Sequence, residues 1–384
     1  MTKTRARRAG EATSTPRLTR AVLAFVVTIA LAAWGPPGRA HGTSLPTRLS
    51  DADFWSIIET MSEPDGRFSS DNLVSNEDTF QFVIPELQKT VKPGGVYVGV
   101  GPDQNFTYIA ALKPGIVFIP DVRRGNLHMH LMYKALMEES ADRAAFLSRL
   151  FSRERPAGLA ESATPLQMFE AYAAAAASRE IFDRTLREIS ERLRKIHGFK
   201  VSDADMLGIS YILGFFYGSG PFLSYTSGPA RPGSRYPAYA ELQLAQDRAG
   251  VTRAYLSSEE HYRTVRGLQQ RNLIVPVVGN FAGPKALRAI GAWARDRGAV
   301  VTTFYTSNVE QYLFQDGIWG TFAENIASMP LDASSTLIRS CFDRCVNQSS
   351  VSRVEMLLDS MPALVTDHQA GLIRGYWDVL SRKR

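Results

Sequence analysis

The sequence predicts an α/β fold: a doubly wound, mostly parallel sheet with a large helical insertion. Two observations carry this prediction. Short, almost wholly apolar runs occur on both sides of a long helical stretch, and such runs are typical of strands buried on both faces of a sheet. Helical patterns separate successive runs, and this alternation favours parallel strands that are joined by helices.

Composition places the chain among soluble globular proteins and argues against nucleic-acid binding. The chain has 384 residues, of which 45% are hydrophobic, enough for one large domain or two ordinary ones. The formal charge of +6 comes from the N-terminus, because residues 1–40 contain seven basic residues and one acidic residue. Residues 41–384 therefore hold 37 basic and 37 acidic residues, and a nucleic-acid partner would need a basic surface.

Residues 1–40 are predicted to be a signal peptide. An apolar run of 13 residues, 21–33, follows Arg17 and Arg20 and ends at Trp34-Gly35-Pro36-Pro37. Small residues follow at 38–40, where cleavage is expected, and the run is short for a membrane span. We expect export to the periplasm or beyond, with no stable span after cleavage. The alternative is an uncleaved anchor at 21–33 with the body facing outward.

The first part of the sheet domain is predicted within residues 41–150. Its first helix has the capping residues Ser50 and Asp53, and its second has Ser75 with Asp78 three residues later. The expected elements are helices at 50–61 and from Ser75, strands at 96–100 and 116–120, and helices at 106–112 and 126–151.

A nucleotide-type site is predicted between the first two strands. Gly99 and Gly101 permit a sharp turn and close approach of the backbone to a ligand. Asp121 stands at the end of the next strand, 20 residues after Gly101, where an acid can bind ribose hydroxyls. The alternative is an ordinary strand–helix–strand unit. Glu77 is close in sequence, and it either helps to close this site or complements a helix dipole.

A helical insertion is predicted at 151–270, and the second part of the sheet domain at 271–384. The expected elements are helices at 168–197, 203–217, 237–249 and 257–270, then strands at 273–278, 299–305 and 335–339, with a helix at 284–297 after the first of these strands. The helix at 203–217 is too short to span a membrane and is predicted to be buried.

Cysteine and histidine usage predicts neither a disulfide scaffold nor a metal site. Cys341 and Cys345 are four residues apart, a spacing that would put them on one helical turn as two half-buried thiols. A bridge or a metal pair is the alternative. His128 and His130 are two residues apart, so on a helix they would point to different faces.

Polar or glycine residues follow four of the predicted strands. These strand ends are 99–105, Asp121, 279–281 and 306–310. Ligands of open parallel sheets bind outside the carboxyl ends of the strands, so we expect the four segments to meet around one ligand.

This arrangement resembles the class I S-adenosylmethionine-dependent methyltransferase superfamily, which has a Rossmann-like fold. Four stretches resemble more closely a bacterial family of uncharacterised, exported methyltransferase-like proteins, a likeness that covers residues 49–339. They read S-D-N-L-V-S-N-E from Ser70, G-V-Y-V-G-V-G-P-D-Q-N-F-T-Y from Gly95, L-I-V-P-V-V-G-N-F-A-G-P-K-A-L from Leu273 and F-Y-T-S-N-V-E-Q-Y-L from Phe304.

The resemblance implies a binding site for S-adenosylmethionine. Gly99 and Gly101 would lie against the methionine part, and Asp121 would bind the ribose hydroxyls. Asn280 and Phe281 would meet the edge and the face of the adenine. With the neighbouring strand-end residues, the predicted cofactor-binding set is Glu77, Gly99, Gly101, Gln104, Asn105, Asp121, Asn280 and Phe281.

The segment Thr306-Ser307-Asn308 occupies the place of the superfamily's fourth motif, near the transferable methyl group. It lacks the Asn-Pro-Pro-aromatic or Asp-Pro-Pro-aromatic form, so it does not indicate an amino-methylating enzyme. Methyl transfer needs positioning and a group that accepts a proton. Glu310, Tyr305 and Tyr312 are the nearest candidates for that role, with structural roles as the alternative. The predicted catalytic residues are Asn308, Glu310 and Tyr305.

Two residues of the glycine turn argue against NAD and FAD. Gln104 stands where the third glycine of G-x-G-x-x-G would be, and Asp103 adds a negative charge. A pyrophosphate would be repelled by that charge, whereas a sulfonium or an ammonium would not. A nicotinamide oxidoreductase is therefore the weakest hypothesis.

Two hypotheses about function follow. The first is a methyltransferase that uses S-adenosylmethionine on a small molecule, with 151–270 as a lid over the site. The second is an exported binding protein that keeps the nucleotide pocket without catalysis, because S-adenosylmethionine is a cytosolic metabolite.

Overall fold

Six strands form one sheet at the centre of the described chain. The computed structural model describes residues 44–230, 234–343, 345 and 352–382, which belong to one compact unit. The predicted signal peptide lies outside the described residues. The strands are β1 (Val96–Gly99), β2 (Ile116–Asp121), β3 (Ile274–Val278), β4 (Val301–Ser307), β5 (Thr336–Phe342) and β6 (Val354–Ser360).

The strand order in the sheet is β3-β2-β1-β4-β5-β6. The first five strands are mutually parallel, and β6 runs antiparallel to β5 at the edge. Val98 of β1 pairs with Phe118 of β2 on one side and with Phe304 of β4 on the other. All three side chains are fully buried, as the apolar runs require. The predicted α/β fold with a mostly parallel sheet is confirmed.

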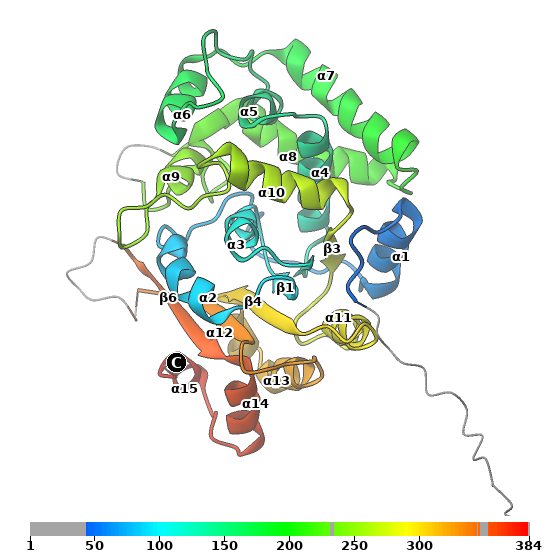
Figure 1. Ribbon diagram of the computed structural model, residues 1–384, viewed down its shortest axis with the longest axis vertical. Helices are drawn as coiled ribbons and strands as arrows, with labels where there is room; N and C mark the ends of the chain where they lie inside the picture. Colours follow the sequence, from blue (N-terminus) through cyan, green and yellow to red (C-terminus); the bar gives the residue numbers. More distant parts are fainter. Residues whose placement is uncertain (1–43, 231–233, 344, 346–351, 383–384) are drawn as a thin grey trace, which may run out of the picture. The chain divides into compact units, whose positions relative to one another are not determined.

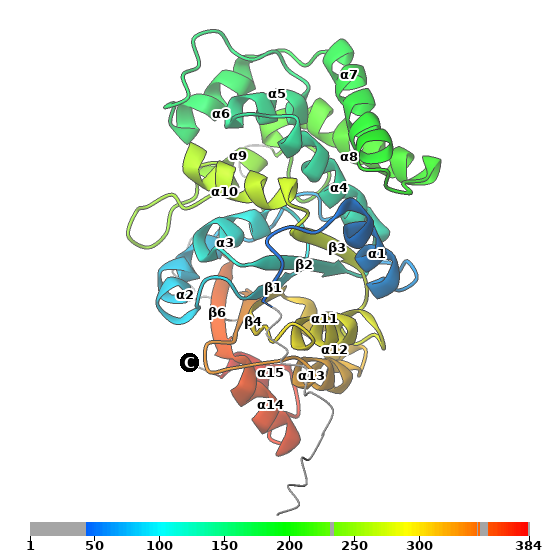
Figure 2. The same ribbon diagram turned by 45° about the vertical axis from the view of Figure 1, so that its right-hand side comes forward.

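Helices cover both faces of the sheet (Figures 1 and 2). One face carries α2 (Ile84–Thr90), α3 (Gln104–Leu112), α4 (Arg124–Glu138) and α10 (Glu259–Gln270), while α1 (Asp51–Met61) packs on the edge strand β3. The opposite face carries α11 (Ala286–Arg295), α12 (Val309–Gln315), α13 (Trp319–Ala327), α14 (Met361–Gln369) and α15 (Tyr376–Leu380).

The insertion forms a further helical layer that packs on α4 and lies on the far side of α4 and α10 from the sheet (Figure 2). This layer contains α5 (Arg143–Phe151), which begins before the predicted insertion at 151–270, followed by α6 (Pro165–Ala174), α7 (Arg179–Ser190), α8 (Asp203–Ser219) and α9 (Tyr239–Leu244), with a π-helical turn at Glu191–Ile196. The last helix of the predicted insertion, α10, packs instead on α3 and α4. Contrary to prediction, α8 is not wholly buried, because Leu207 and Tyr211 are exposed. Among the described residues, no helix has the length and apolar character needed to cross a membrane.

Three predicted helices differ in the structure because local caps interrupt them. Ser75 does not start a helix; its hydroxyl accepts a hydrogen bond from the backbone N–H of Glu77, a turn that competes with helix formation. A 3-10 turn at Phe80–Val83 then leads into α2. The expected helix at 126–151 is divided by Asp142, which caps α5, and the one at 168–197 by Ser178, which caps α7.

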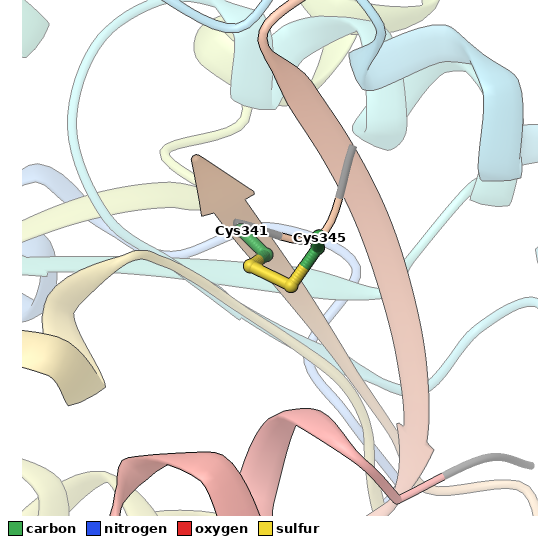
Figure 3. Close-up of a disulfide and its surroundings, with 2 residues drawn as sticks. All are labelled: Cys341 and Cys345. Atoms are coloured by element: carbon green, nitrogen blue, oxygen red, sulfur yellow. A yellow bond between two sulfur atoms is a disulfide. The ribbon is translucent and has the colours of Figure 1, made fainter. Parts of the chain in front are cut away.

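The two cysteines form a disulfide, so the prediction of two thiols on a helical turn is wrong. Cys341 lies in β5 and Cys345 in the connection to β6, with their Cα atoms 5.7 Å apart (Figure 3). The prediction assumed a helix, whereas Cys341 lies in a strand that ends at Phe342 and pairs antiparallel with β6.

Candidate functional site

A cavity opens at the carboxyl ends of the parallel strands, where the strand order reverses between β1 and β4. Its wall combines the segment before β1, the turns that follow β1, β2 and β3, and the start of α12. This is the position at which open α/β sheets bind ligands. Seven of the predicted site residues line it: Glu77, Gly101, Gln104, Asp121, Asn280, Phe281 and Asn308.

Glu77 places a buried carboxylate in the cavity wall. Its side chain is 1% exposed and accepts hydrogen bonds from the hydroxyls of Tyr305 (2.6 Å) and Ser307 (2.5 Å). Burial raises the pKa of this carboxyl against the effect of those hydrogen bonds. Among the described residues no Lys, Arg or His forms an ion pair with Glu77. Within the described ranges, no cation therefore compensates the charge that this carboxyl carries when it is ionised.

Ser307 owes its position to an irregular end of β4. Its φ is 51°, in the left-handed region that is uncommon for serine, and the β4–β5 register shifts between Tyr305 and Ser307. The side chain of the preceding Thr306 contacts β5 instead, where its hydroxyl donates to the carbonyl of Ile338. The irregularity brings the Ser307 hydroxyl to Glu77 and Asn308 to the cavity wall. Backbone strain of this kind is typical of functional sites.

Gly99 and Asn105 shape the glycine turn from behind the cavity rather than lining it. A Cβ at Gly99 would overlap Oδ1 of Asn105, so only glycine fits there. The Asn105 amide donates to the carbonyls of Val100 and Pro102, each at 2.8 Å, and accepts from the hydroxyl of Tyr97. Both residues hold the turn in shape, and their predicted contact with a ligand has no geometric support.

Gly101 lines the cavity with a φ of 79°, which favours glycine. Its carbonyl oxygen lies 2.9 Å from Nε2 of His130 on α4, so that nitrogen carries the hydrogen. Burial lowers the pKa of His130 to about 4, and the imidazole is neutral at pH 7. His130 therefore supports the turn from the protein interior.

Gln104 connects the glycine turn to Glu77. Its Nε2 donates to the hydroxyl of Tyr305 at 2.8 Å, and that hydroxyl donates to Glu77. The Gln104 carbonyl oxygen is buried without a hydrogen-bond partner, as is that of Asn72 on the opposite loop. Both residues line the cavity, and neither oxygen has a hydrogen-bond partner within the described ranges.

Asp121 lines the cavity at the end of β2, but it is paired with Arg123. Its Oδ1 accepts from the Arg123 backbone N–H at 2.9 Å, and its Oδ2 accepts from Nη2 at 3.1 Å. The same guanidinium donates to the carbonyls of Ser70 and Asp71 and so holds that loop beside the cavity. Oδ1 also accepts from Nε of Arg123 at 3.2 Å, whereas Oδ2 keeps a second lone pair, so Asp121 can still accept one hydrogen bond from a ligand hydroxyl.

The turn after β3 presents Asn280 to the cavity. Glu63, which follows α1, fixes this turn by accepting from the backbone N–H groups of Asn280 (3.1 Å) and Ala286 (2.8 Å). The Asn280 side chain accepts from the backbone N–H of Ala282, which leaves its amide hydrogens for a ligand.

Phe281 lines the cavity with a side chain that is 3% exposed. It packs on Phe304 and Phe322, with ring centroids 5.0 and 5.7 Å away. The ring therefore has a fixed orientation and forms a rigid apolar part of the wall.

Two of the three predicted catalytic residues lie outside the cavity. Glu310 is buried, accepts from Nε1 of Trp319 at 3.0 Å and forms an ion pair with Arg339. Arg339 also pairs with Asp359 at 2.8 Å. Tyr305 is fully buried beneath Glu77, and burial raises its pKa well above the usual value. Neither residue is placed to accept a proton from a substrate.

Asp103 also lies outside the cavity, so the expected repulsion of a pyrophosphate by its charge is wrong. Its carboxyl is buried and accepts from the hydroxyl of Tyr255 (3.0 Å) and from the amide of Gln243 (3.3 Å), which belong to the insertion. Burial raises its pKa to about 7. Of the acids that line the cavity, Asp121 is paired with Arg123 and Asp316 is exposed, whereas Glu77 is buried and forms no ion pair within the described ranges.

Sequence reasoning missed several wall residues. Arg67, Phe68 and Tyr225 line the outer part of the cavity together with Tyr312, whose ring meets Phe68 edge-on at 5.1 Å. Tyr225 comes from the insertion, and no local pattern marks it. Arg123 could have been identified from the sequence, because it follows Asp121, the acid at the end of the strand, by two residues. No group of three His, Cys, Asp or Glu residues in the described ranges could hold a metal ion.

A protein-family model matches more than half of the chain. A family model with the description Domain of unknown function (DUF7790) matches residues 72–204 and 233–365. These ranges contain the cavity residues from Asn72 to Asp121 and those from Gly279 to Asp316. No curated protein matches the chain.

Proposed function

The chain belongs to this family, and we propose that it is a Rossmann-like methyltransferase that binds S-adenosylmethionine in the cavity and acts on a small molecule. The observation that carries this proposal is the position of the cavity. Strands β2 and β3 follow β1 to one side, β4 and β5 lie on the other, and the cavity lies where these two halves meet. This is the crevice at which doubly wound sheets bind nucleotide-type ligands.

The charge and hydrogen-bonding capacity of the wall fit a cationic ligand. Glu77 supplies an unpaired buried carboxylate, and Gln104 and Asn72 supply unpartnered carbonyl oxygens. An unpaired buried charge is destabilising, so a cation at this point is favourable. S-adenosylmethionine carries a sulfonium and an ammonium, whereas the pyrophosphate of NAD or FAD would face the Glu77 charge.

The remaining wall residues suit the adenosine part. Asp121 keeps a lone pair on Oδ2 for a ribose hydroxyl, Asn280 keeps amide hydrogens for the adenine edge, and Phe281 offers a fixed aromatic surface. When bound, the cofactor would supply an electrophilic methyl group. Asn308 and Ser307 lie beside Glu77, so a methyl acceptor would be oriented there.

Calorimetric titration of the protein with S-adenosylmethionine tests the proposal. We expect binding that Asp121→Ala weakens about tenfold, because a charged hydrogen-bond acceptor is lost. The control is Glu86→Ala, which removes an exposed carboxylate on α2, away from the cavity. Absence of binding by the wild-type protein at millimolar ligand would remove the enzyme hypothesis.

A second candidate function is an exported binding protein without catalysis. Two observations favour it: two of the three candidate bases, Glu310 and Tyr305, lie outside the cavity, with Tyr312 alone of the three in its wall, and the Cys341–Cys345 disulfide is a feature of oxidising compartments. Fractionation with mass mapping of the mature N-terminus tests export, since a cytosolic protein that begins at Met1 would contradict it. Transfer of a labelled methyl group to any component of a cell extract would contradict the non-catalytic role.

A further inference from the structure

Ser307 connects the cavity at the strand ends to the buried carboxylate of Glu77. Both residues line that cavity, where Ser307 is half-buried and Glu77 is buried. The Ser307 hydroxyl donates its single hydrogen to Oε1 of Glu77 at 2.5 Å, and within the described ranges no group donates to its oxygen. A molecule in the cavity can therefore donate to Ser307, which in turn donates to Glu77.

The other carboxylate oxygen of Glu77 is held from the protein interior. Oε2 accepts from the hydroxyl of Tyr305 at 2.6 Å, and that hydroxyl accepts from Nε2 of Gln104 at 2.8 Å. Because both of these bonds supply a hydrogen toward Glu77, they fix the carboxylate with Oε1 toward Ser307. Oε1 is therefore the oxygen that a proton from the cavity can reach.

The surroundings of Glu77 favour its protonation unless a cation is close. Burial raises its pKa against the hydrogen bonds that it accepts, and the charge of the neighbouring Asp78 raises it further. Three phenols interact electrostatically with Glu77, and burial raises the pKa of each well above the usual value: Tyr97, Tyr108 and Tyr305. The other charged residues of the cavity wall are Arg67, Asp121, Arg123 and Asp316.

We propose that Glu77, acting through Ser307, takes up the proton that a methyl acceptor with a hydroxyl or amine group releases, an inference that rests on the function proposed above. In the transfer, the acceptor forms a bond to the methyl carbon, and the carbon–sulfur bond breaks with its electron pair on sulfur. The acceptor's proton passes to Oγ of Ser307, while the hydroxyl hydrogen of Ser307 passes to Oε1 of Glu77.

The charge of the site couples the two events. Ionised Glu77 has a counter-charge while a sulfonium is bound beside it, and it loses that counter-charge when the methyl group leaves. A buried carboxylate without a counter-charge binds a proton more readily. Glu77 therefore becomes a stronger base as the transfer proceeds, and proton uptake leaves the site without an uncompensated charge.

Calorimetry with S-adenosylmethionine and S-adenosylhomocysteine from pH 5 to 7 tests this coupling without catalysis. The amino groups of both ligands stay mostly protonated in this range, so the ligands differ in charge at the sulfonium. We expect the preference for S-adenosylmethionine to increase with pH, by up to about tenfold per unit, because it favours ionised Glu77 and S-adenosylhomocysteine favours the protonated form. A preference independent of pH would overturn this inference alone, whereas no binding of either ligand would also remove the proposed function.

Three variants assign the pH dependence. Glu77→Gln should make the preference independent of pH. Ser307→Ala should keep the dependence but move it to higher pH, because a hydrogen bond to the ionised carboxylate is lost. The matched control is Asp316→Asn, which removes an exposed acid from the same wall and should behave as the wild type. Loss of the pH dependence in this control would overturn the assignment to Glu77.

Transfer of a labelled methyl group to components of a cell extract tests the route through Ser307. At pH 8 and saturating S-adenosylmethionine, Ser307→Ala should lower the transfer rate at least tenfold. The control is Ser69→Ala, which removes an exposed hydroxyl outside the cavity. Equal rates in the two variants would overturn the role of Ser307, and absence of transfer by the wild-type protein would overturn the catalytic proposal together with this inference.

Discussion

Replacing Asp103 by asparagine should change the pH dependence of stability in a defined way. The Asp103 carboxyl is buried against Tyr255 and Gln243, and burial raises its pKa from 3.8 to about 7. The folded state therefore holds this proton more tightly than the unfolded chain does. As pH rises from 3.8 to 7, the unfolded chain loses its proton first, and the free energy of unfolding falls.

The magnitude follows from the size of the shift. A raised pKa of about 7 is roughly 3 pH units above the ordinary value, and each unit corresponds to about 1.4 kcal/mol. Asparagine has the shape of the protonated acid and does not ionise. Asp103→Asn should therefore match the wild type below pH 4 and exceed it by about 4 kcal/mol above pH 7.

Urea unfolding at pH values from 4 to 8 measures the free energy of unfolding of the variant and of the wild type. In the difference between the two, the contributions of other titrating groups cancel. The control is Asp203→Asn, whose side chain is 96% exposed. Parallel stability curves for Asp103→Asn and the wild type would refute the reasoning, because they would mean that the Asp103 carboxyl ionises equally in both states.

Three further predictions concern the cavity and its supports. Glu77→Gln should weaken S-adenosylmethionine binding about tenfold by removing the buried charge, while calorimetry with S-adenosylhomocysteine, which lacks the sulfonium, should show a smaller loss; undiminished affinity for both ligands would exclude Glu77 from cation binding. Glu310→Gln should lower the free energy of unfolding by about 1–3 kcal/mol, because Arg339 loses one of its two buried carboxylate partners and keeps Asp359, yet leave the ligand affinity of the folded protein unchanged. Weaker ligand binding in that variant would instead return Glu310 to the site. Replacing Cys341 and Cys345 by serine should lower stability in chemical denaturation by about 2 kcal/mol, and a wild-type protein insensitive to reducing agent would contradict this.

The sequence alone determined the α/β class and most of the strands. The buried strands carry apolar runs that only a sheet covered on both faces would hide, and each strand has its boundary at a glycine or polar residue. Strand ends of a parallel sheet must meet at one edge, so Gly101, Asp121, Asn280 and Asn308 could be assigned to one cavity before the fold was known.

Only the tertiary structure decided which way the side chains beside those strand ends face. Asp103 and Asn105 adjoin wall residues in sequence, yet one is buried against the insertion and the other braces the turn. Glu77 reaches the cavity because the turn at Ser75 replaces the expected start of a helix. Tyr225 reaches the cavity because it belongs to the insertion, which packs beside the site. Periodicity is a local property that a sequence displays directly, whereas the partner of a buried charge depends on long-range packing, and here that packing left Glu77 unpaired.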